Sequence, residues 1–244
     1  MRSNIPVLNV YQKQNKKSEV VTQLLYGDSF KKMKKNKLWI KIKNDSDNYN
    51  GYIINKNFPP NQKNTHKIFT LSANLYSKPN NSNKIKTKLS FGSKIKVIND
   101  KQTFYKFDKF WIKKNSLIKI NIKARNNFQN INKFINVKYK WGGKHYSGVD
   151  CSGLVQLFMN LNNKFCPRDA GDQKKFLKKK VKLNNIRKND LIFWKSHVAV
   201  IISKNKLIHS YGPFKSVVVM PIKKTIDRIF KTAKLKVTGI RRLN

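Results

Sequence analysis

The chain has 244 residues, of which 54 are Lys or Arg and 11 are Asp or Glu, so its formal net charge is +43. This length suffices for one or two domains, and the 39% hydrophobic content predicts a folded chain instead of a disordered one. The N-terminal segment lacks the apolar run of a secretory signal, and no run of about 18 apolar residues occurs that could span a membrane. We therefore expect no membrane span, and a cytoplasmic location in preference to a periplasmic or wall-associated one.

The positive charge favours a nucleic-acid partner at first sight, because basic surfaces attract phosphate. The lysines, however, are spread over every segment together with abundant asparagine, which indicates a drift in composition along the whole chain. Zinc-finger spacing, a helix-turn-helix pattern and aromatic RNA-binding motifs are absent from the sequence. We expect no specific nucleic-acid partner, whereas a salt-sensitive attraction to an anionic substrate or polymer stays open.

The first sixty residues are typical of short strands separated by turns. Apolar, β-branched and aromatic residues gather in four segments, at 7–11, 20–26, 38–42 and 51–54. Strands at this spacing, broken by Asn, Asp and Gly, predict a small barrel. A Pro-Pro-Asn segment at 59–61 indicates a linker after it.

Residues 68–120 repeat this plan at a period of about 65 residues. The segment 85–92 resembles 20–27, since both are apolar stretches that end in a glycine turn. Further on, Trp111-Ile112 resembles Trp39-Ile40. The repeat predicts a second barrel of the same kind.

The pattern of apolar residues changes after about residue 125. Phe128, Ile131, Phe134 and Ile135 have helical spacing, which predicts a helix over 124–136. A second apolar-periodic stretch begins at Cys151. Strands are predicted at 191–194, 197–202 and 206–211.

Cys151 lies in the turn Asp150-Cys151-Ser152-Gly153, at the start of this second helical stretch. A thiolate is a strong nucleophile, and the N–H groups and positive dipole end of a helix N-terminus favour it. The other cysteine, Cys166, is interpreted as a small buried residue. Two cysteines without CxxC spacing predict neither a disulfide framework nor a metal site, and we expect no cofactor.

Two histidines follow Cys151 at workable positions. His197 stands at the head of one predicted strand, and His209 lies in the next. If opposed residue numbers in this hairpin sum to an even number, both imidazoles share one face, whereas a shift of one residue separates them. His197 could then act as the base and His209 could orient it. A third histidine, His145, is expected in a glycine-rich loop.

These residues belong to an ordered series of motifs, namely Tyr139-x-Trp141-Gly142-Gly143, Gly148-x-Asp150-Cys151-Ser152-Gly153-Leu154-Val155-Gln156, Pro167-Arg168-Asp169, Gln173, 190–194, His197-Val198-Ala199 and His209. On these motifs the chain resembles the NlpC family of papain-like bacterial cell-wall peptidases. The upstream half resembles the paired bacterial SH3-like domains of one subgroup. The implied fold is α+β: a papain-like cysteine peptidase domain at 123–244, preceded by two small all-β SH3-like barrels at 1–60 and 61–122.

The resemblance implies that Cys151 is the nucleophile, His197 the base and His209 the orienting residue. It also places Tyr139 by the oxyanion side of the site or by the substrate. The implied reaction is hydrolysis of the bond between γ-D-glutamyl and a diamino acid in peptidoglycan-derived peptides that begin with a free L-Ala. The sequence leaves the diamino acid open.

The same resemblance implies a pocket for the free amine of that L-Ala. Asp150 and Ser152 would line the pocket. Asp28 would face the amine from the first SH3-like domain, in a Leu-Leu-Tyr-Gly-Asp turn where Glu is usual, and Tyr49 would help.

Three other functions stay open. The chain could be a non-catalytic protein that binds cell wall or polyanions, a nucleic-acid binder driven by charge, or an acyl transferase that uses the same thiol chemistry.

Overall fold

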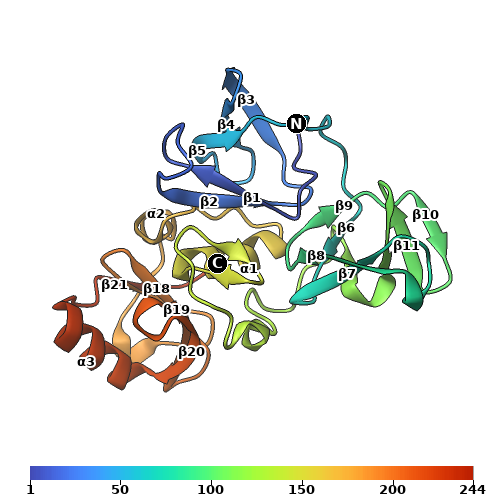
Figure 1. Ribbon diagram of the computed structural model, residues 1–244. Coiled ribbons are helices and arrows are strands. Elements are labelled where there is room, and N and C mark those ends of the chain that lie inside the picture. Colours follow the sequence, from blue (N-terminus) through green and yellow to red (C-terminus); the bar gives the residue numbers. More distant parts are fainter. Residues whose placement is uncertain (244) are drawn as a thin grey trace.

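The computed structural model describes residues 1–243 and shows three lobes in chain order (Figure 1). The first lobe is a five-stranded antiparallel sheet in the order β2-β1-β5-β4-β3. Its strands are β1 (Val7–Tyr11), β2 (Val20–Leu25), β3 (Phe30–Lys35), β4 (Trp39–Asn44) and β5 (Asn50–Ile54). Strand β3 was not expected, because after its buried first residue the remaining five side chains are exposed and give no apolar alternation.

The second lobe contains a sheet of the same connectivity, in the order β8-β7-β12-β11-β10, and a three-stranded sheet β13-β6-β9. Its strands are β6 (His66–Ile68), β7 (Ser72–Tyr76), β8 (Lys84–Ser90), β9 (Lys94–Ile95), β10 (Asn99–Lys101), β11 (Phe104–Phe107), β12 (Phe110–Lys113) and β13 (Leu117–Lys119). The matching strand orders confirm the internal repeat.

The strand alignment within the repeat differs from the one predicted. Trp39 lies in β4, which pairs with β3 and β5. Trp111 lies in β12, which pairs with β7 as β5 pairs with β1, so β12 corresponds to β5. The predicted match of Trp111-Ile112 with Trp39-Ile40 is therefore wrong by one strand. Local sequence could not reveal this, because only hydrogen-bond partners distinguish two neighbouring strands of similar composition.

The third lobe packs α1 (Cys151–Leu161) against a six-stranded sheet in the order β16-β21-β17-β18-β19-β20. These strands are β16 (Lys180–Val181), β17 (Leu191–Trp194), β18 (His197–Ile201), β19 (Lys206–Tyr211), β20 (Ser216–Pro221) and β21 (Gly239–Arg241). A hairpin of β14 (Lys144–His145) and β15 (Gly148–Val149) and the helices α2 (Ala170–Phe176) and α3 (Ile222–Ala233) complete the lobe. Leu154 and Phe158 of α1 share one buried core with Val198 and Ile208 of the sheet.

The predicted helix over 124–136 is wrong. Only Ile131–Phe134 is helical there, as a single 3-10 turn. Asn130 and Asn136 adopt left-handed backbone conformations, with φ of 61° and 67°, and such residues interrupt an α-helix. The apolar residues Phe128, Ile131 and Phe134 are nevertheless buried. Their spacing therefore indicated which residues are buried, but it did not indicate a helix.

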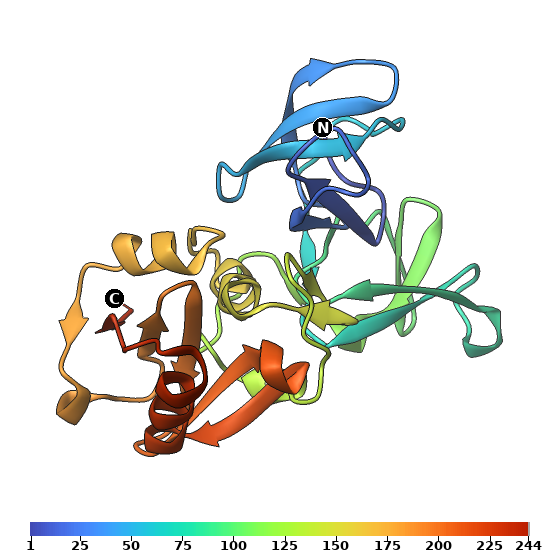
Figure 2. The ribbon, with the colours of Figure 1, turned by 60° about the vertical axis from the view of Figure 1, so that its left-hand side comes forward.

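Helix α1 lies at the junction of the lobes in both views (Figures 1 and 2). Lys67 of the second lobe donates from Nζ to the carbonyl oxygens of Ile120, at 2.9 Å, and Leu161, at 2.5 Å, the latter being the last residue of α1. Gln156 of α1 donates to Asp47 Oδ2 of the first lobe at 2.9 Å. Polar contacts thus tie α1 to both barrels. Among the described residues, no helix is long and apolar enough to cross a membrane.

Candidate active site

The start of α1 is held by Asp150, which caps the helix. Its Oδ1 accepts a hydrogen bond from Gly153 N at 2.7 Å, and its Oδ2 accepts one from Gly142 N at 2.8 Å. Gly153 itself is required by packing, because a Cβ there would lie 2.4 Å from the carbonyl oxygen of Gly143. Cys151 therefore opens the helix as the sequence predicted, and it is buried, with 7% of its surface exposed.

Arg168 neutralises the capping carboxylate. Its guanidinium forms a two-pronged ion pair with Asp150, with Nη1–Oδ1 at 3.0 Å and Nη2–Oδ2 at 2.5 Å. It also donates to Ser152 Oγ at 2.9 Å and, from Nε, to Thr22 Oγ1 of the first lobe at 2.9 Å. Both charged side chains are almost fully buried. The Asp150 carboxylate is thus already matched by a cation of the protein.

The two histidines lie on one face of the β18–β19 hairpin. Val200 pairs with Ile208 and Ile201 with Leu207, so opposed numbers sum to 408, which is the even register that the sequence left open. His197 Nε2 lies 2.8 Å from His209 Nδ1. His209 is buried and stacks on Tyr211, with ring centroids 4.7 Å apart and an interplanar angle of 11°.

The first residues of β18 flank the thiol. Cys151 Sγ lies 4.0 Å from the carbonyl oxygen of Ser196, and the backbone of Val198 helps to lower the pKa of the thiol. His197 stands between these two residues in the chain. Because its Nε2 faces His209, Nδ1 is the ring nitrogen left to exchange a proton with Cys151.

Burial sets the protonation states of these groups. It raises the pKa of the Cys151 thiol to about 12, with a further rise from the nearby Asp150 carboxylate. Burial also lowers the pKa of His197 to about 4, and holds the pKa of His209 well below its usual value. At neutral pH the site therefore holds a thiol and neutral imidazoles, in place of the thiolate–imidazolium pair that a helix N-terminus and a histidine favour.

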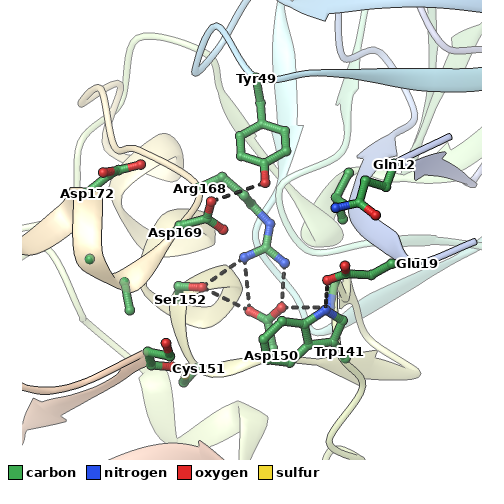
Figure 3. Close-up of a pocket in the computed structure, with 15 residues that line it drawn as sticks. Gln12, Glu19, Tyr49, Trp141, Asp150, Cys151, Ser152, Arg168, Asp169 and Asp172 are labelled. Atoms are coloured by element: carbon green, nitrogen blue, oxygen red, sulfur yellow. Dashed lines mark hydrogen bonds and ion pairs between the residues drawn. The ribbon is translucent and has the colours of Figure 1, made fainter.

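A cavity of about 370 Å³ opens beside Cys151, with walls from two lobes (Figure 3). The first lobe contributes Glu19 and Tyr49, and the third lobe contributes Trp141 and Asp169. Tyr49 Oη donates to Asp169 Oδ2 at 3.1 Å, and Trp141 Nε1 donates to Glu19 Oε1 at 2.5 Å. Burial raises the pKa of the Asp169 carboxyl and, together with Asp169, that of the Tyr49 hydroxyl. The cavity therefore presents carboxylate oxygens from both lobes to a ligand.

The predicted site residues are brought together, with one exception. Asp150, Cys151, Ser152 and Tyr49 line this cavity, and the Ser152 hydroxyl bridges Asp150 and Arg168. His197 and His209 lie behind Cys151, on the sheet.

Tyr139 lies outside the cavity lining but near the thiol. Burial raises the pKa of its hydroxyl to about 12, and the charge of Cys151 contributes to that rise.

Asp28 is the exception, because it does not line this cavity. Its Oδ2 accepts a hydrogen bond from Leu25 N at 2.9 Å, and its Oδ1 pairs with Lys94 Nζ at 3.2 Å. The short side chain closes its own turn and joins the two barrels. His145 also differs from expectation, since it is buried in β14 and not a loop residue.

Glu19, Asp169 and Trp141 were missed by the sequence prediction of the pocket. Two signals pointed to them. Glu19 is the one glutamate of the chain, and Asp169 ends the Pro-Arg-Asp motif. Among residues 1–243, no group of three or more His, Cys, Asp or Glu side chains is arranged to hold a metal ion.

A buried cysteine at a helix N-terminus, packed against an antiparallel sheet that carries paired histidines, is the arrangement of the papain-like fold. Residues 136–233 match the model of the NlpC/P60 family, and residues 6–58 match that of the bacterial SH3 domain. The third lobe thus carries an NlpC/P60 domain, and the first lobe carries a bacterial SH3 domain.

Named relatives agree with this assignment. The chain is 34% identical over 101 residues, 38% of its length, to the gamma-D-glutamyl-L-lysine dipeptidyl-peptidase of Bacillus subtilis (strain 168), of which it covers 34%. It is 26% identical over 239 residues to a protein of the same name from Bacillus cereus, covering 84% of this chain and 71% of that protein. The chain thus spans only about a third, or less, of the length of the first relatives that it matches.

The fold also matches a solved structure over its whole length. The crystal structure of an NlpC/P60 family protein from Bacillus cereus ATCC 10987 superposes with a TM-score of 0.84 at 19% identity, covering 99% of this chain and 98% of that chain. The three-lobed architecture is therefore shared with that protein.

Proposed function

We propose that the protein is a cysteine peptidase that hydrolyses the bond between γ-D-glutamyl and a diamino acid in peptidoglycan-derived peptides with a free N-terminal L-Ala. The observation that carries the proposal is the cavity beside Cys151, because its walls also hold the carboxylates of Glu19 and Asp169. A nucleophile and a site for an ammonium group therefore share one pocket. The names of the two Bacillus relatives support the same bond.

The proposed reaction uses the groups in the order in which they lie. Cys151 Sγ attacks the γ-carbonyl carbon while His197 Nδ1 takes the thiol proton. The Nδ1 of His209 holds the His197 ring at its Nε2. The backbone N–H of Cys151 stabilises the oxyanion. His197 then gives the proton to the departing amine of the diamino acid, which leaves a thioester. Water, deprotonated by His197, hydrolyses that thioester and restores the thiol.

Selection of a free amine follows from charge. An ammonium group between Glu19 and Asp169 gains charge-assisted hydrogen bonds, whereas an acylated amine has no charge and adds bulk. Asp150 contributes shape more than charge, because Arg168 already pairs with it. The +43 net charge of the chain attracts the carboxylate-rich peptide at low salt.

The test compares L-Ala-γ-D-Glu-L-Lys and L-Ala-γ-D-Glu-diaminopimelate with their N-acetylated forms, with release of the diamino acid measured by chromatography. We expect release from a free-amine peptide and none with Cys151→Ala. Absence of release from both free peptides would refute the peptidase. Equal cleavage of free and acetylated peptides would refute the amine site alone.

Two variants locate the amine site. Glu19→Gln and Asp169→Asn should each lower kcat/KM for the free peptide about tenfold or more, because hydrogen bonds to a charged group contribute about 1.5–3 kcal/mol. Asp100→Asn is the matched control, since Asp100 is an exposed carboxylate of the second lobe that pairs with Lys114. Unchanged kcat/KM in both pocket variants would contradict the assignment.

A further inference from the structure

The second ring nitrogen of His209 faces an unusual partner. Its Nδ1 faces His197, and its Nε2 lies 3.4 Å from Sδ of Met220. Met220 belongs to β20, whose register sets Val218 opposite His209. Met220 is two residues further along the strand, so it lies on the same face of the sheet as His209. Within residues 1–243, this thioether is the hydrogen-bond partner of His209 Nε2.

A thioether limits which tautomer His209 can adopt. The sulfur carries lone pairs and no hydrogen, so it can only accept. A buried Nε2 without a proton would set its own lone pair against those of the sulfur, whereas Nε2–H donates to them. The His209 ring is neutral because burial holds its pKa low, so it has one proton to place. That proton belongs on Nε2, and Nδ1 is left as an acceptor.

The tautomer of His209 determines that of His197, the histidine next to the thiol, through one hydrogen bond. If His209 Nδ1 accepts, then His197 Nε2 must donate across the 2.8 Å contact. A neutral His197 that is protonated on Nε2 has its lone pair on Nδ1, which is the tautomer able to take a proton from Cys151. The opposite tautomer of His209 would put a proton on His197 Nδ1 and remove the base.

We propose that Met220 is a positioning residue whose thioether fixes the Nε2–H tautomer of His209 and, through it, the Nε2–H tautomer of His197. The inference rests on the proposed roles of Cys151 and His197, but its physical content is the tautomer, which exists whether or not a peptide is cleaved. Unlike a carboxylate at that place, the thioether brings no charge, so it orients the histidine pair without converting His209 to an imidazolium.

The direct test is nitrogen NMR of protein labelled with 15N-histidine. The chain has four histidines, so four imidazole patterns appear, and His66→Asn and His145→Asn variants remove the two that lie outside the pair. We expect His209 and His197 of the wild-type protein to show protonated Nε2 and unprotonated Nδ1. A protonated Nδ1 on His209 would overturn the proposal. This reading needs no substrate, so it stays decisive if the peptidase assay fails.

The variant test separates tautomer control from packing. Met220→Leu keeps a similar volume and removes the acceptor, so His209 should show a mixture of tautomers and kcat should fall on the order of tenfold at unchanged KM. Met159→Leu is the matched control, because Met159 is a buried methionine of α1 elsewhere in the core. If Met220→Leu retains the wild-type tautomers, or changes kcat no more than Met159→Leu does, the proposal is overturned.

Discussion

Replacing Arg168 by methionine should destabilise the protein strongly. The side chain is 2% exposed and donates two hydrogen bonds to Asp150, one to Ser152 and one to Thr22. Methionine fills much of the volume but leaves the Asp150 carboxylate buried without its cation. Breaking a buried pair in this way costs about 3–5 kcal/mol of unfolding free energy. With a urea m-value near 3 kcal/mol/M, the midpoint should fall by about 1–2 M.

Urea unfolding followed by circular dichroism measures this loss. Lys175→Met is the matched control, because Lys175 is 81% exposed and pairs with Asp172 at 3.5 Å, so its loss should cost about 0.5 kcal/mol or less. The double variant Asp150→Asn/Arg168→Met removes both charges and keeps a capping side chain, so it should recover part of the stability.

Two results would refute this reasoning. One is a cost for Arg168→Met below about 1 kcal/mol, which is the range of an exposed pair. The other is a double variant no more stable than Arg168→Met, because then the unpaired charge is not the source of the loss.

Three further predictions follow from burial. The kcat/KM should rise with pH through the pKa of His197, about 4, because the base must be neutral. It should then stay level through neutral pH, because Cys151 stays a thiol. A rise of kcat/KM with a midpoint at pH 6.5 or above would contradict this. Burial lowers the pKa of His145 to about 4, so between that pH and 6.5 mainly the unfolded chain binds the proton, and the free energy of unfolding falls as pH falls. His145→Asn should remove about 2 kcal/mol of that fall, measured from urea midpoints at pH 7 and 4.5. Lys67→Met leaves the carbonyl oxygen of Leu161 without its donor and should lower the free energy of unfolding by about 2–3 kcal/mol in the same assay. A loss below about 0.5 kcal/mol would mean that other contacts join the lobes.

The positions of Cys151 and of the two histidines' strands were predictable because their signals are local. The Asp-Cys-Ser-Gly turn marks the helix cap and the start of α1 within four residues, whereas the even register of the two adjacent strands was left open by the sequence and was decided by the structure. The helix predicted over 124–136 failed for a related reason: the apolar spacing was right about burial, but two asparagines in left-handed conformations set the backbone.

The proposed ammonium site shows where sequence reasoning stops. Glu19 and Asp169 are 150 residues apart in the chain and line one cavity only because the first lobe lies beside α2 (Figure 1). Asp28 carries an acidic group at the position where the resemblance expects one, yet its side chain, shorter than the usual Glu, caps its own turn and pairs with Lys94. Residue type and motif cannot distinguish these cases, because the choice depends on which lobe surface faces the cavity.

The sequence by itself determined that the chain holds a cysteine at a helix start and two histidines on adjacent strands, downstream of repeated barrels, since helix caps, strand patterns and repeats are local properties. The tertiary structure alone decided three other things. It set the partner of Asp150, the carboxylates that face a ligand, and the thioether that meets His209. Each of these is a contact between segments far apart in the chain or on different strands, and the packing of the lobes and the register of the sheet create it.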